Sequence, residues 1–397
     1  MTGTRINPLA FLSDELNTLK QKGTYFKLRV LEDEQAAVCH FDGRKVINLA
    51  SNNYLGLTTH PKLREAALAA TRKYGVGSGA VRTIAGTMKI HVELEENIAR
   101  FKGVEACVVF QSGFTANAGT VSSFLGKDDY IISDELNHAS IIDGCRLSRA
   151  KILVFRHKDV AHAEEQLASV ANLPGKKLLI SDGVFSMDGD IGPLPQLVEI
   201  AEKHGAIMMV DDAHSSGVLG RNGRGTIDHF NLHGRVDIQV GTLSKAIGVL
   251  GGYVCGTKDL IEFLYHRARP FLFSTSHPPS VAASCIAAFE ILEDEPERIG
   301  QLWANTRYFK QGLVDAGFDT GISETPITPV IVGEAARAFQ LSDGLFQEGV
   351  LATGIAFPTV AKDKARVRTI VNATHTTEQL DRALEAFRKV GRRMGIV

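Results

Sequence analysis

Short apolar runs alternate with longer segments of helical periodicity over most of this sequence, and this alternation limits the fold more than any other feature. The segments Pro61–Lys73 and Leu194–His204 have the pattern of helices. Alternation of strands and helices predicts an α/β fold with a largely parallel sheet, which binds ligands at the carboxyl ends of its strands. The buried strands are expected at Ala106–Phe110, Tyr130–Ser133, Ile152–Phe155, Leu178–Ser181, Ile207–Val210 and Asp237–Val240.

The pattern changes after about residue 280, where two successive helices, Ser280–Leu292 and Arg298–Ala316, are expected before two strands, Thr328–Val332 and Val367–Val371. This order predicts a smaller α+β domain at the C-terminus. Its last helix should begin at the capping-box spacing of Thr376 and Gln379 and bury the apolar face formed by Leu380, Leu384, Phe387 and Val390. We therefore expect an N-terminal helix and arm at 1–50, a large domain at 51–280 and a small domain at 281–397.

Composition excludes several classes of protein. The chain has 44 Lys and Arg against 45 Asp and Glu, so no field of one sign would attract nucleic acid or an anionic membrane. Its N-terminal 23 residues form an amphipathic pattern rather than a signal sequence, and no run approaches the roughly 18 apolar residues of a membrane span. Five widely spaced cysteines without a Cys-x-x-Cys pair predict neither disulfides nor a zinc site and favour the cytoplasm.

The strongest local signal is a carboxylate and an amine at the ends of consecutive strands. Asp211 follows one apolar run, and Lys245 follows the next within a loop of small residues. Parallel strands bring both side chains to the same edge of the sheet. A lysine in such a place is costly to desolvate unless its charge is paired or its amine is used covalently. An isolated Ser–Lys pair in a loop is more often simply exposed.

Three further segments add to this edge. The small-residue turn at 112–117 leads from a strand into a helix and can bind a phosphate through free N–H groups. The segment at 134–140 brings His138 past another strand end, and the segment at 181–189 brings Ser186 past a third. A lysine, an acidic partner, a phosphate cup and a planar side chain together meet the requirements of pyridoxal phosphate.

The chain resembles the α-oxoamine synthases, which are pyridoxal phosphate enzymes of the aspartate-aminotransferase-like group (fold type I). The resemblance spans nearly the whole chain and is carried by segments 51–57, 112–114, 136–140, 182–189, 211–214, 241–246 and 366–368. It implies a mostly parallel sheet in the large domain, a small α+β domain, and a homodimer with active sites at the subunit interface.

The same resemblance implies a role for each matching residue. Lys245 would form the Schiff base, Asp211 would pair with the pyridine nitrogen, and His138 would stack on the ring. Ser186 and His214 would bind the phenolic oxygen. The remaining residues are two substrate-carboxylate ligands, Asn52 and Arg368, and the phosphate or cofactor contacts Ser112, Gly113, Phe114 and Thr242, with Ser274 and Thr275 from the partner subunit. Strand position alone would place Arg368 and its neighbour Arg366 on the surface.

Within the family, segments 80–87, 137–144 and 269–276 favour the glycine C-acetyltransferase branch. The expected reaction is condensation of glycine with acetyl-CoA, without decarboxylation, to give 2-amino-3-ketobutyrate and CoA, as part of threonine catabolism. The alternatives are 8-amino-7-oxononanoate synthase, which uses alanine and a pimeloyl thioester in biotin synthesis, a promiscuous α-oxoamine synthase and, with less support, serine palmitoyltransferase. A non-catalytic cofactor binder or an NAD-dependent oxidoreductase would belong to other classes.

Two other motifs suggest a dinucleotide-binding loop and a metal site, but the surrounding sequence supports neither. Gly75–Gly79 resembles a dinucleotide-binding loop, but a helical pattern precedes it where a strand is required. It more closely fits a tight turn at the site or an interface. Asp134 and His138 lack the further His or Cys ligands that a metal site needs, so no metal is expected.

Overall fold

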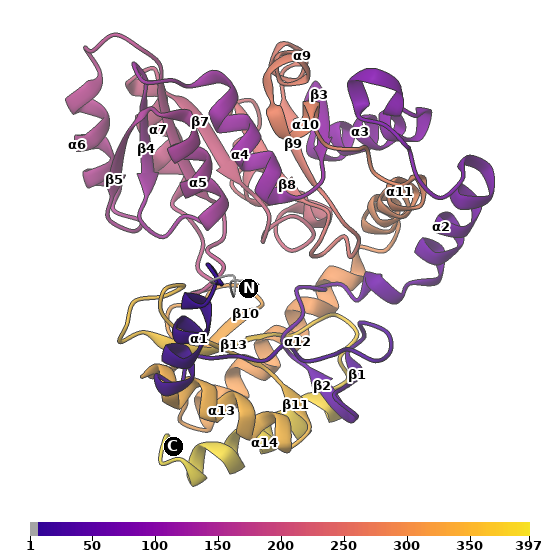
Figure 1. The fold of residues 1–397 in the computed structure, drawn as a ribbon, viewed down its shortest axis with the longest axis vertical. Helices are drawn as coiled ribbons and strands as arrows, with labels where there is room; N and C mark the ends of the chain where they lie inside the picture. Colours follow the sequence, from indigo (N-terminus) through magenta and orange to yellow (C-terminus); the bar gives the residue numbers. More distant parts are fainter. Residues whose placement is uncertain (1–6) are drawn as a thin grey trace, which may run out of the picture.

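A seven-stranded sheet forms the centre of the larger part of the molecule (Figure 1). The computed structural model describes residues 7–397. In sheet order the strands are β3 (Ala106–Phe110), β9 (Gly252–Gly256), β8 (Ile238–Thr242), β7 (Ile207–Asp211), β6 (Lys177–Asp182), β4 (Tyr130–Asp134) and β5 (Lys151–Phe155). Only β9 runs antiparallel to its neighbours in this sheet. The six expected strands are confirmed, whereas the short, glycine-flanked β9 was not predicted.

Except at the edge strand β5, which is partly exposed, the sheet is buried on both faces. This explains why its strands read as continuous apolar runs. In β6, Leu178 and Ile180 belong to one hydrophobic cluster. Leu179, which points to the opposite face, belongs to another. All three side chains are fully buried. The expected α/β class, with a mostly parallel sheet, is confirmed.

Ten α-helices belong to the same part of the chain. Helix α4 lies against β8 and β9, α6 lies against β4 and β5, and α11 packs on α2 and α3. Their bounds are α2 (Pro61–Tyr74), α3 (Lys89–Lys102), α4 (Gly113–Phe124), α5 (Ala139–Ser148), α6 (Val160–Val170), α7 (Leu194–Lys203), α8 (Thr226–His229), α9 (Lys258–Arg267), α10 (Arg269–Leu272) and α11 (Pro279–Asp294).

The smaller part lies below this sheet in Figure 1. It contains α12 (Glu297–Asp315), β10 (Ile327–Gly333), α13 (Ala335–Gln347), β11 (Val350–Leu351), β12 (Thr353–Ile355), β13 (Ala365–Ile370) and α14 (Thr377–Arg393). Strand β11 pairs with β2 (Arg44–Asn48), which also pairs with β1 (Val38–Phe41). The capping box of Thr376 and Gln379 is present, and the predicted apolar face of α14 is buried. The domain limits at 50 and 280 stay a prediction.

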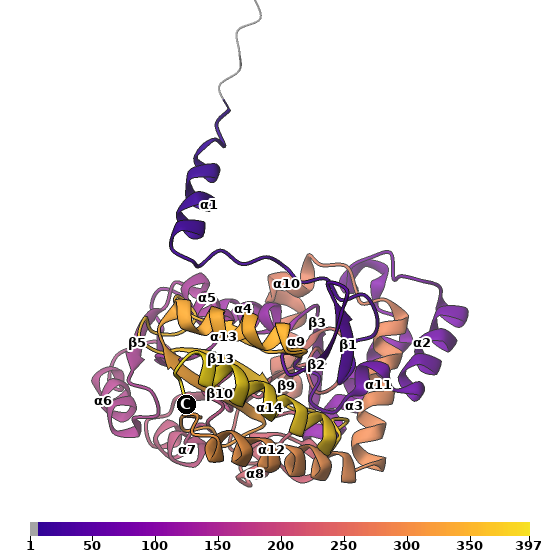
Figure 2. The ribbon, with the colours of Figure 1, turned by 90° about the horizontal axis from the view of Figure 1, so that it is seen from below.

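Helix α1 (Phe11–Gln21) matches the amphipathic pattern expected at the N-terminus, of which residues 1–6 lie outside the described part. The helix buries none of its residues and projects away from the rest of the molecule (Figure 2). None of the helices within residues 7–397 combines the length and the apolar character needed to cross a bilayer.

A fully buried ion pair joins α3 to the loop after β7. Lys102 Nζ lies 2.9 Å from Asp212 Oδ2, and the two side chains are 1% and 0% exposed. Lys102 also donates to the carbonyl of Arg224 at 2.6 Å. Gly225 makes this possible, since its φ is +98° and a Cβ there would lie 2.0 Å from Asp212. The pair therefore fixes the segment next to the carboxyl edge of the sheet.

We expect Lys102→Met to lower the free energy of unfolding by about 3–5 kcal/mol, because it leaves a buried carboxylate without its cation. Urea unfolding at fixed protein concentration measures this change. Lys89→Met, which removes an exposed pair with Glu93, should change it by less than about 0.5 kcal/mol. Equal effects of the two substitutions would contradict this account.

Candidate active site

Loops that follow five parallel strands meet at one edge of the sheet. The strands are β3, β4, β6, β7 and β8, and their loops carry Ser112, His138, Ser186, His214 and Lys245 respectively. Strand direction is the reason, since the carboxyl ends of parallel strands share an edge. The structure therefore brings together the groups that the sequence placed at strand ends.

Asp211 is the buried carboxylate of this edge, with 4% of its surface exposed. Its Oδ2 accepts a hydrogen bond from Asn117 Nδ2 at 2.5 Å, and its Oδ1 accepts one from the backbone N–H of Ala213 at 2.8 Å. Asn117 also donates to Ser140 Oγ, which lies 2.7 Å from His138 Nδ1. A chain of polar contacts thus links Asp211 to His138. The sequence pattern predicts that Asn117 lies in the helix after the turn, but it does not indicate that its side chain binds Asp211.

Lys245 is half-buried beside this carboxylate. Desolvation lowers the pKa of its amine to about 8, and Arg368 acts in the same direction, while Asp211 and Asp182 oppose the shift. An amine with this pKa is partly neutral near pH 8 and can attack a carbonyl group. The position of Lys245 therefore suits covalent attachment of an aldehyde.

The turn before α4 presents the positive end of a twelve-residue helix to the same edge. Ser112 caps the helix by accepting from the N–H of Thr115 at 3.1 Å. Gly252 of β9 lies directly against this turn, because a Cβ there would come within 2.4 Å of the Ser112 carbonyl. A Cβ on Gly113 would lie 3.5 Å from Thr242, so these two residues adjoin. Phe114 is exposed beside them.

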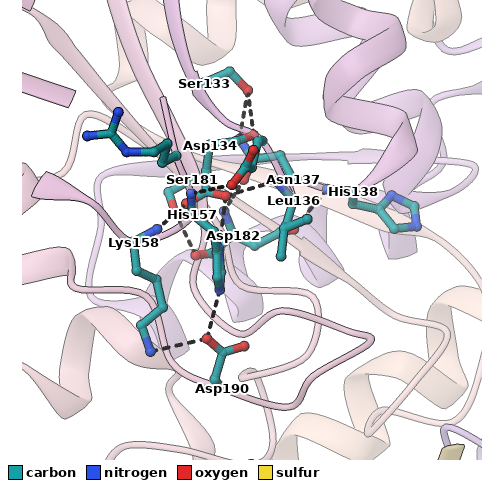
Figure 3. A network of polar contacts seen from close by, with 12 residues as sticks. Ser133, Asp134, Leu136, Asn137, His138, His157, Lys158, Ser181, Asp182 and Asp190 are labelled. Atoms are coloured by element: carbon teal, nitrogen blue, oxygen red, sulfur yellow. Dashed lines mark hydrogen bonds and ion pairs between the residues drawn. The ribbon is translucent and has the colours of Figure 1, made fainter. Parts of the chain in front are cut away.

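His138 follows β4 and is held through its backbone. Its N–H donates to Asp182 Oδ2 at 2.9 Å, and Figure 3 shows its ring pointing away from the polar network beside it. Desolvation lowers the pKa of His138. The charge of Asp211 opposes this shift, and Lys245 lowers the pKa further. A neutral ring so placed can cover the face of a planar ligand.

His214 is paired with a tyrosine that the sequence did not single out. Its Nδ1 lies 2.7 Å from the hydroxyl of Tyr54, and both side chains are buried. Burial holds the pKa of His214 well below its usual value, and the cations Lys245 and Arg368 lower it further. The imidazole is therefore neutral. Tyr54 lies within segment 51–57, which carried the family resemblance, and this was its one available signal.

Arg368 and Asn52 meet across the two parts of the chain. Arg368 Nη2 donates to Asn52 Oδ1 at 3.1 Å, and its Nε is buried without a partner among the described residues. The surface position expected for both arginines of β13 is wrong, because Arg366 is 3% exposed and Arg368 is half-buried. Packing of β13 below the sheet edge buries them, which strand position alone does not report. The unused guanidinium N–H of Arg368 suits a carboxylate ligand.

Ser274 and Thr275 lie near the phosphate turn within this chain. The carbonyl of Thr275 accepts a hydrogen bond from the side chain of Gln111 at 2.7 Å. Gln111 directly precedes Ser112. The expectation that Ser274 and Thr275 serve a second subunit stays a prediction.

The arrangement fits pyridoxal phosphate on four independent points. It supplies a partly neutral amine at Lys245, a buried carboxylate at Asp211, a helix N-terminus at Gly113 and a ring at His138. The buried, unpartnered Nε of Arg368 adds a place for the carboxylate of an amino acid. These are the functions that enzymes using this cofactor need from a protein.

Comparison with known proteins agrees with this chemistry. Residues 44–387 match the model of the aminotransferase class I and II family. The chain is 63% identical to an 8-amino-7-oxononanoate synthase of Symbiobacterium thermophilum, over 98% of this chain and 99% of that one. It is 54% identical to 8-amino-7-oxononanoate synthase 1 of Bacillus subtilis, over 98% of each chain.

Two solved structures of enzymes have folds similar to that of this chain. A serine palmitoyltransferase from S. paucimobilis with bound PLP–myriocin aldimine superposes with a TM-score of 0.93 and 33% identity, over 99% of this chain and 100% of that one. An 8-amino-7-oxononanoate synthase from Francisella tularensis gives a TM-score of 0.74 and 30% identity, over 89% and 99% of the two chains.

These findings correct one expectation. The assignment to glycine C-acetyltransferase and threonine catabolism is wrong, because relatives at 54–63% identity carry the name 8-amino-7-oxononanoate synthase. Segments 80–87, 137–144 and 269–276, on which the assignment was based, therefore do not distinguish these branches. By its family match and its structural neighbours, the chain belongs to the aminotransferase class I and II family and, within it, to the pyridoxal phosphate-dependent α-oxoamine synthases.

Proposed function

We propose that this protein is an 8-amino-7-oxononanoate synthase, which joins alanine to a pimeloyl thioester. The observation that carries the proposal is the 63% identity, over 98% of the chain, with a relative of that name. A cavity of about 420 Å³ adjoins Lys245 and includes Asn52 in its lining. Its size lies within the range of small-molecule sites.

Carbon balance changes the expected chemistry. The product skeleton has nine carbons, whereas alanine brings three and a pimeloyl group brings seven. One carbon must therefore leave, and the α-carboxylate of alanine departs as carbon dioxide while the thiol is released. This replaces the condensation without decarboxylation expected for glycine.

Asn52 and Arg368 would hold the carboxylate of alanine. Arg368 reaches Asn52 at 3.1 Å and keeps a buried N–H without a partner. A guanidinium can donate two parallel hydrogen bonds to a carboxylate, which fixes the orientation of the amino acid as well as its position. The protein would then set the orientation of the bond between the α-carbon and its proton, which would otherwise rotate freely.

Lys245 would act as the base at the α-carbon. The cofactor, when bound, would supply a sink for the negative charge that forms at the α-carbon. Lys245 Nζ, as a neutral amine, would remove the α-proton and later return a proton to the same carbon. Asp211 would stabilise positive charge on the ring nitrogen, and its hydrogen bonds from Asn117 and Ala213 fix its position.

Ser186 and the neutral His214 would contact the phenolic oxygen of the cofactor, and Tyr54 orients His214. Ser112, Gly113 and Thr242 would bind the phosphate at the N-terminus of α4, with Phe114 beside them. His138 would cover the ring and face the incoming thioester.

We also propose that the protein works as a homodimer. Helix α1 and the segment after it expose Phe11, Leu12, Leu16, Leu19 and Phe26. None of these side chains belongs to a hydrophobic core cluster of the described chain, and α1 extends beyond the body of the molecule (Figure 2). A second copy would cover this surface, and the proposed approach of the partner's Ser274 and Thr275 requires that copy as well.

The substrate assignment is tested by measuring thiol release with pairs of substrates. Alanine with pimeloyl-CoA should exceed glycine with the same thioester by roughly 10–200-fold in kcat/KM, which is the range that one methyl group supplies. Acetyl-CoA with glycine should be the poorest pair. A preference for glycine and acetyl-CoA would overturn the proposal, and equal rates would show a promiscuous enzyme instead.

The lowered pKa of Lys245 predicts how the cofactor-free protein loads its cofactor. Attachment needs the neutral amine, so the rate should rise with pH around a midpoint near 8 rather than near the value of about 10.4 for an exposed lysine. Growth of the visible absorption measures the rate. Arg368→Gln should move the midpoint upward, and Lys245→Ala should show no covalent band. A midpoint near 10 would contradict the assigned environment.

The dimer is tested by replacing Phe11, Leu12, Leu16 and Leu19 with serine. Light scattering during gel filtration should show a mass near that of one chain, 43.0 kDa, at concentrations where the unchanged protein has twice that mass. Leu173→Ser, at another exposed leucine, is the control and should remain dimeric. An unchanged mass for the quadruple variant would remove α1 from the interface.

A further inference from the structure

A network of buried charges lies beside His138 and is not used in the proposed mechanism (Figure 3). It joins the end of β4, the loop after β5 and the loop after β6. Asp134 and Asp190 supply two carboxylates whose side chains are 1% and 0% exposed. Two such carboxylates need a cation, because an uncompensated charge in the interior is strongly destabilising.

His157 lies between these carboxylates and contacts both. Its Nδ1 is 3.0 Å from Asp134 Oδ1, and its Nε2 is 2.9 Å from Asp190 Oδ2. Its ring also meets the edge of Phe185, with the centroids 4.4 Å apart. Within residues 7–397, no other side chain forms an ion pair with both acids. A neutral imidazole has one N–H group and cannot donate to both carboxylates, whereas the imidazolium cation has two N–H groups and can.

The first carboxylate shapes the turn that leads to His138. Asp134 Oδ1 accepts the backbone N–H of Leu136 at 2.9 Å. The carbonyl of Asp134 accepts the N–H of Asn137 at 3.2 Å. These two hydrogen bonds fix the turn that directly precedes His138, so the position of the Asp134 side chain affects the position of His138.

The second carboxylate belongs to the loop that carries Ser186. The carbonyl of Asp190 accepts the N–H of Phe185 at 3.0 Å, and the carbonyl of Phe185 accepts the N–H of Gly189 at 2.8 Å. These bonds close a compact turn, with Ser186 directly after Phe185. His157 holds this turn at two points, through Asp190 and through the ring of Phe185.

We propose that His157 is a positioning residue that, as a cation hydrogen-bonded to both carboxylates, sets the distance between the ring of His138 and the hydroxyl of Ser186. In the proposed site His138 would cover the ring of the cofactor and Ser186 would contact its phenolic oxygen, so a change at His157 would alter the environment of that oxygen. The inference rests on the proposed roles of His138 and Ser186 and is independent of the substrate assignment.

The electrostatic surroundings support a cation at neutral pH. Burial alone would lower the pKa of His157, but Asp134 and Asp190 outweigh it and raise the pKa to about 9. The network holds four other charged groups. Lys158 lies 3.1 Å from Asp190, and Glu324 pairs with Lys158. Glu135 accepts the backbone N–H of His157, and Asp182 accepts that of His138. Because the pKa is raised on folding, the stabilisation is complete below the unfolded value of about 6.5 and is lost as pH rises through about 9.

The test compares His157→Gln with His157→Arg and with a matched control. Glutamine removes the charge, whereas arginine keeps it and can donate to two acids. His204→Gln is the control, because His204 is also shielded, at 14% exposed against 17% for His157, and pairs with one carboxylate, Glu164. It directly follows α7 and precedes β7, at the opposite edge of the sheet.

The first measurement is the pH midpoint of the visible absorption of the cofactor-loaded protein without substrate. His157→Gln should shift it by at least about half a pH unit, which corresponds to a threefold change in the protonation equilibrium. The midpoint of His157→Arg should lie close to that of the unchanged protein, and His204→Gln should leave the midpoint unchanged. Because no substrate is present, an incorrect substrate assignment would not affect this result.

The second measurement is thermal unfolding of the cofactor-free protein. The difference in Tm between the unchanged protein and His157→Gln should be largest below about pH 6.5 and should disappear above about pH 9. When the amino acid is varied at saturating thioester, His157→Gln should lower kcat while KM for the amino acid changes less than twofold. A lower Tm with an unchanged spectral midpoint would reduce His157 to a purely structural residue and overturn the proposal. A Tm difference independent of pH would overturn its cationic role.

Discussion

The buried carboxylate of Asp211 is the charge around which the candidate site is organised. It lies at the end of a central strand, and its two oxygens are held by Asn117 and by the backbone of Ala213. Its charge opposes the desolvation that lowers the pKa of Lys245 and of His138. Without it, burial would act unopposed on His138, and only Asp182 would oppose it at Lys245. The parallel sheet makes this possible, because its carboxyl edge collects side chains from five separate loops.

The small part of the chain contributes to the same edge through β13 and through the segment just before β10. Arg368 of β13 meets Asn52, whereas Arg366, two residues earlier on that strand, donates to the carbonyl of Met187 at 3.0 Å and to Asp188. Thr325 donates to the carbonyl of Gly189 at 2.8 Å. The loop that carries Ser186 is therefore held from both parts of the chain. A displacement of β13 would be felt by the substrate-carboxylate side and the cofactor side together.

Cofactor chemistry and substrate choice have separate physical origins in this protein. Holding pyridoxal phosphate needs an amine, an acid, a helix N-terminus and a ring, and these occur in local motifs that neighbouring branches share. The cavity beside Lys245 is lined instead by residues from distant segments, among them Gln35, Thr58 and Val249, so no single motif contains its shape and polarity. This is why the motifs identified the family correctly and the branch incorrectly.

The sequence alone determined the α/β class, six strands of the large sheet, the capped C-terminal helix and the strand-end positions of Asp211 and Lys245. All of these follow from local periodicity or from the direction of a strand. Tertiary structure alone decided which polar groups meet, such as Tyr54 with His214, 160 residues apart, and Asn117 with Asp211, 94 residues apart. It also buried Arg366 and placed His157 between two acids. Periodicity reports which side of an element is buried, whereas a hydrogen-bond partner across the chain depends on how whole elements pack.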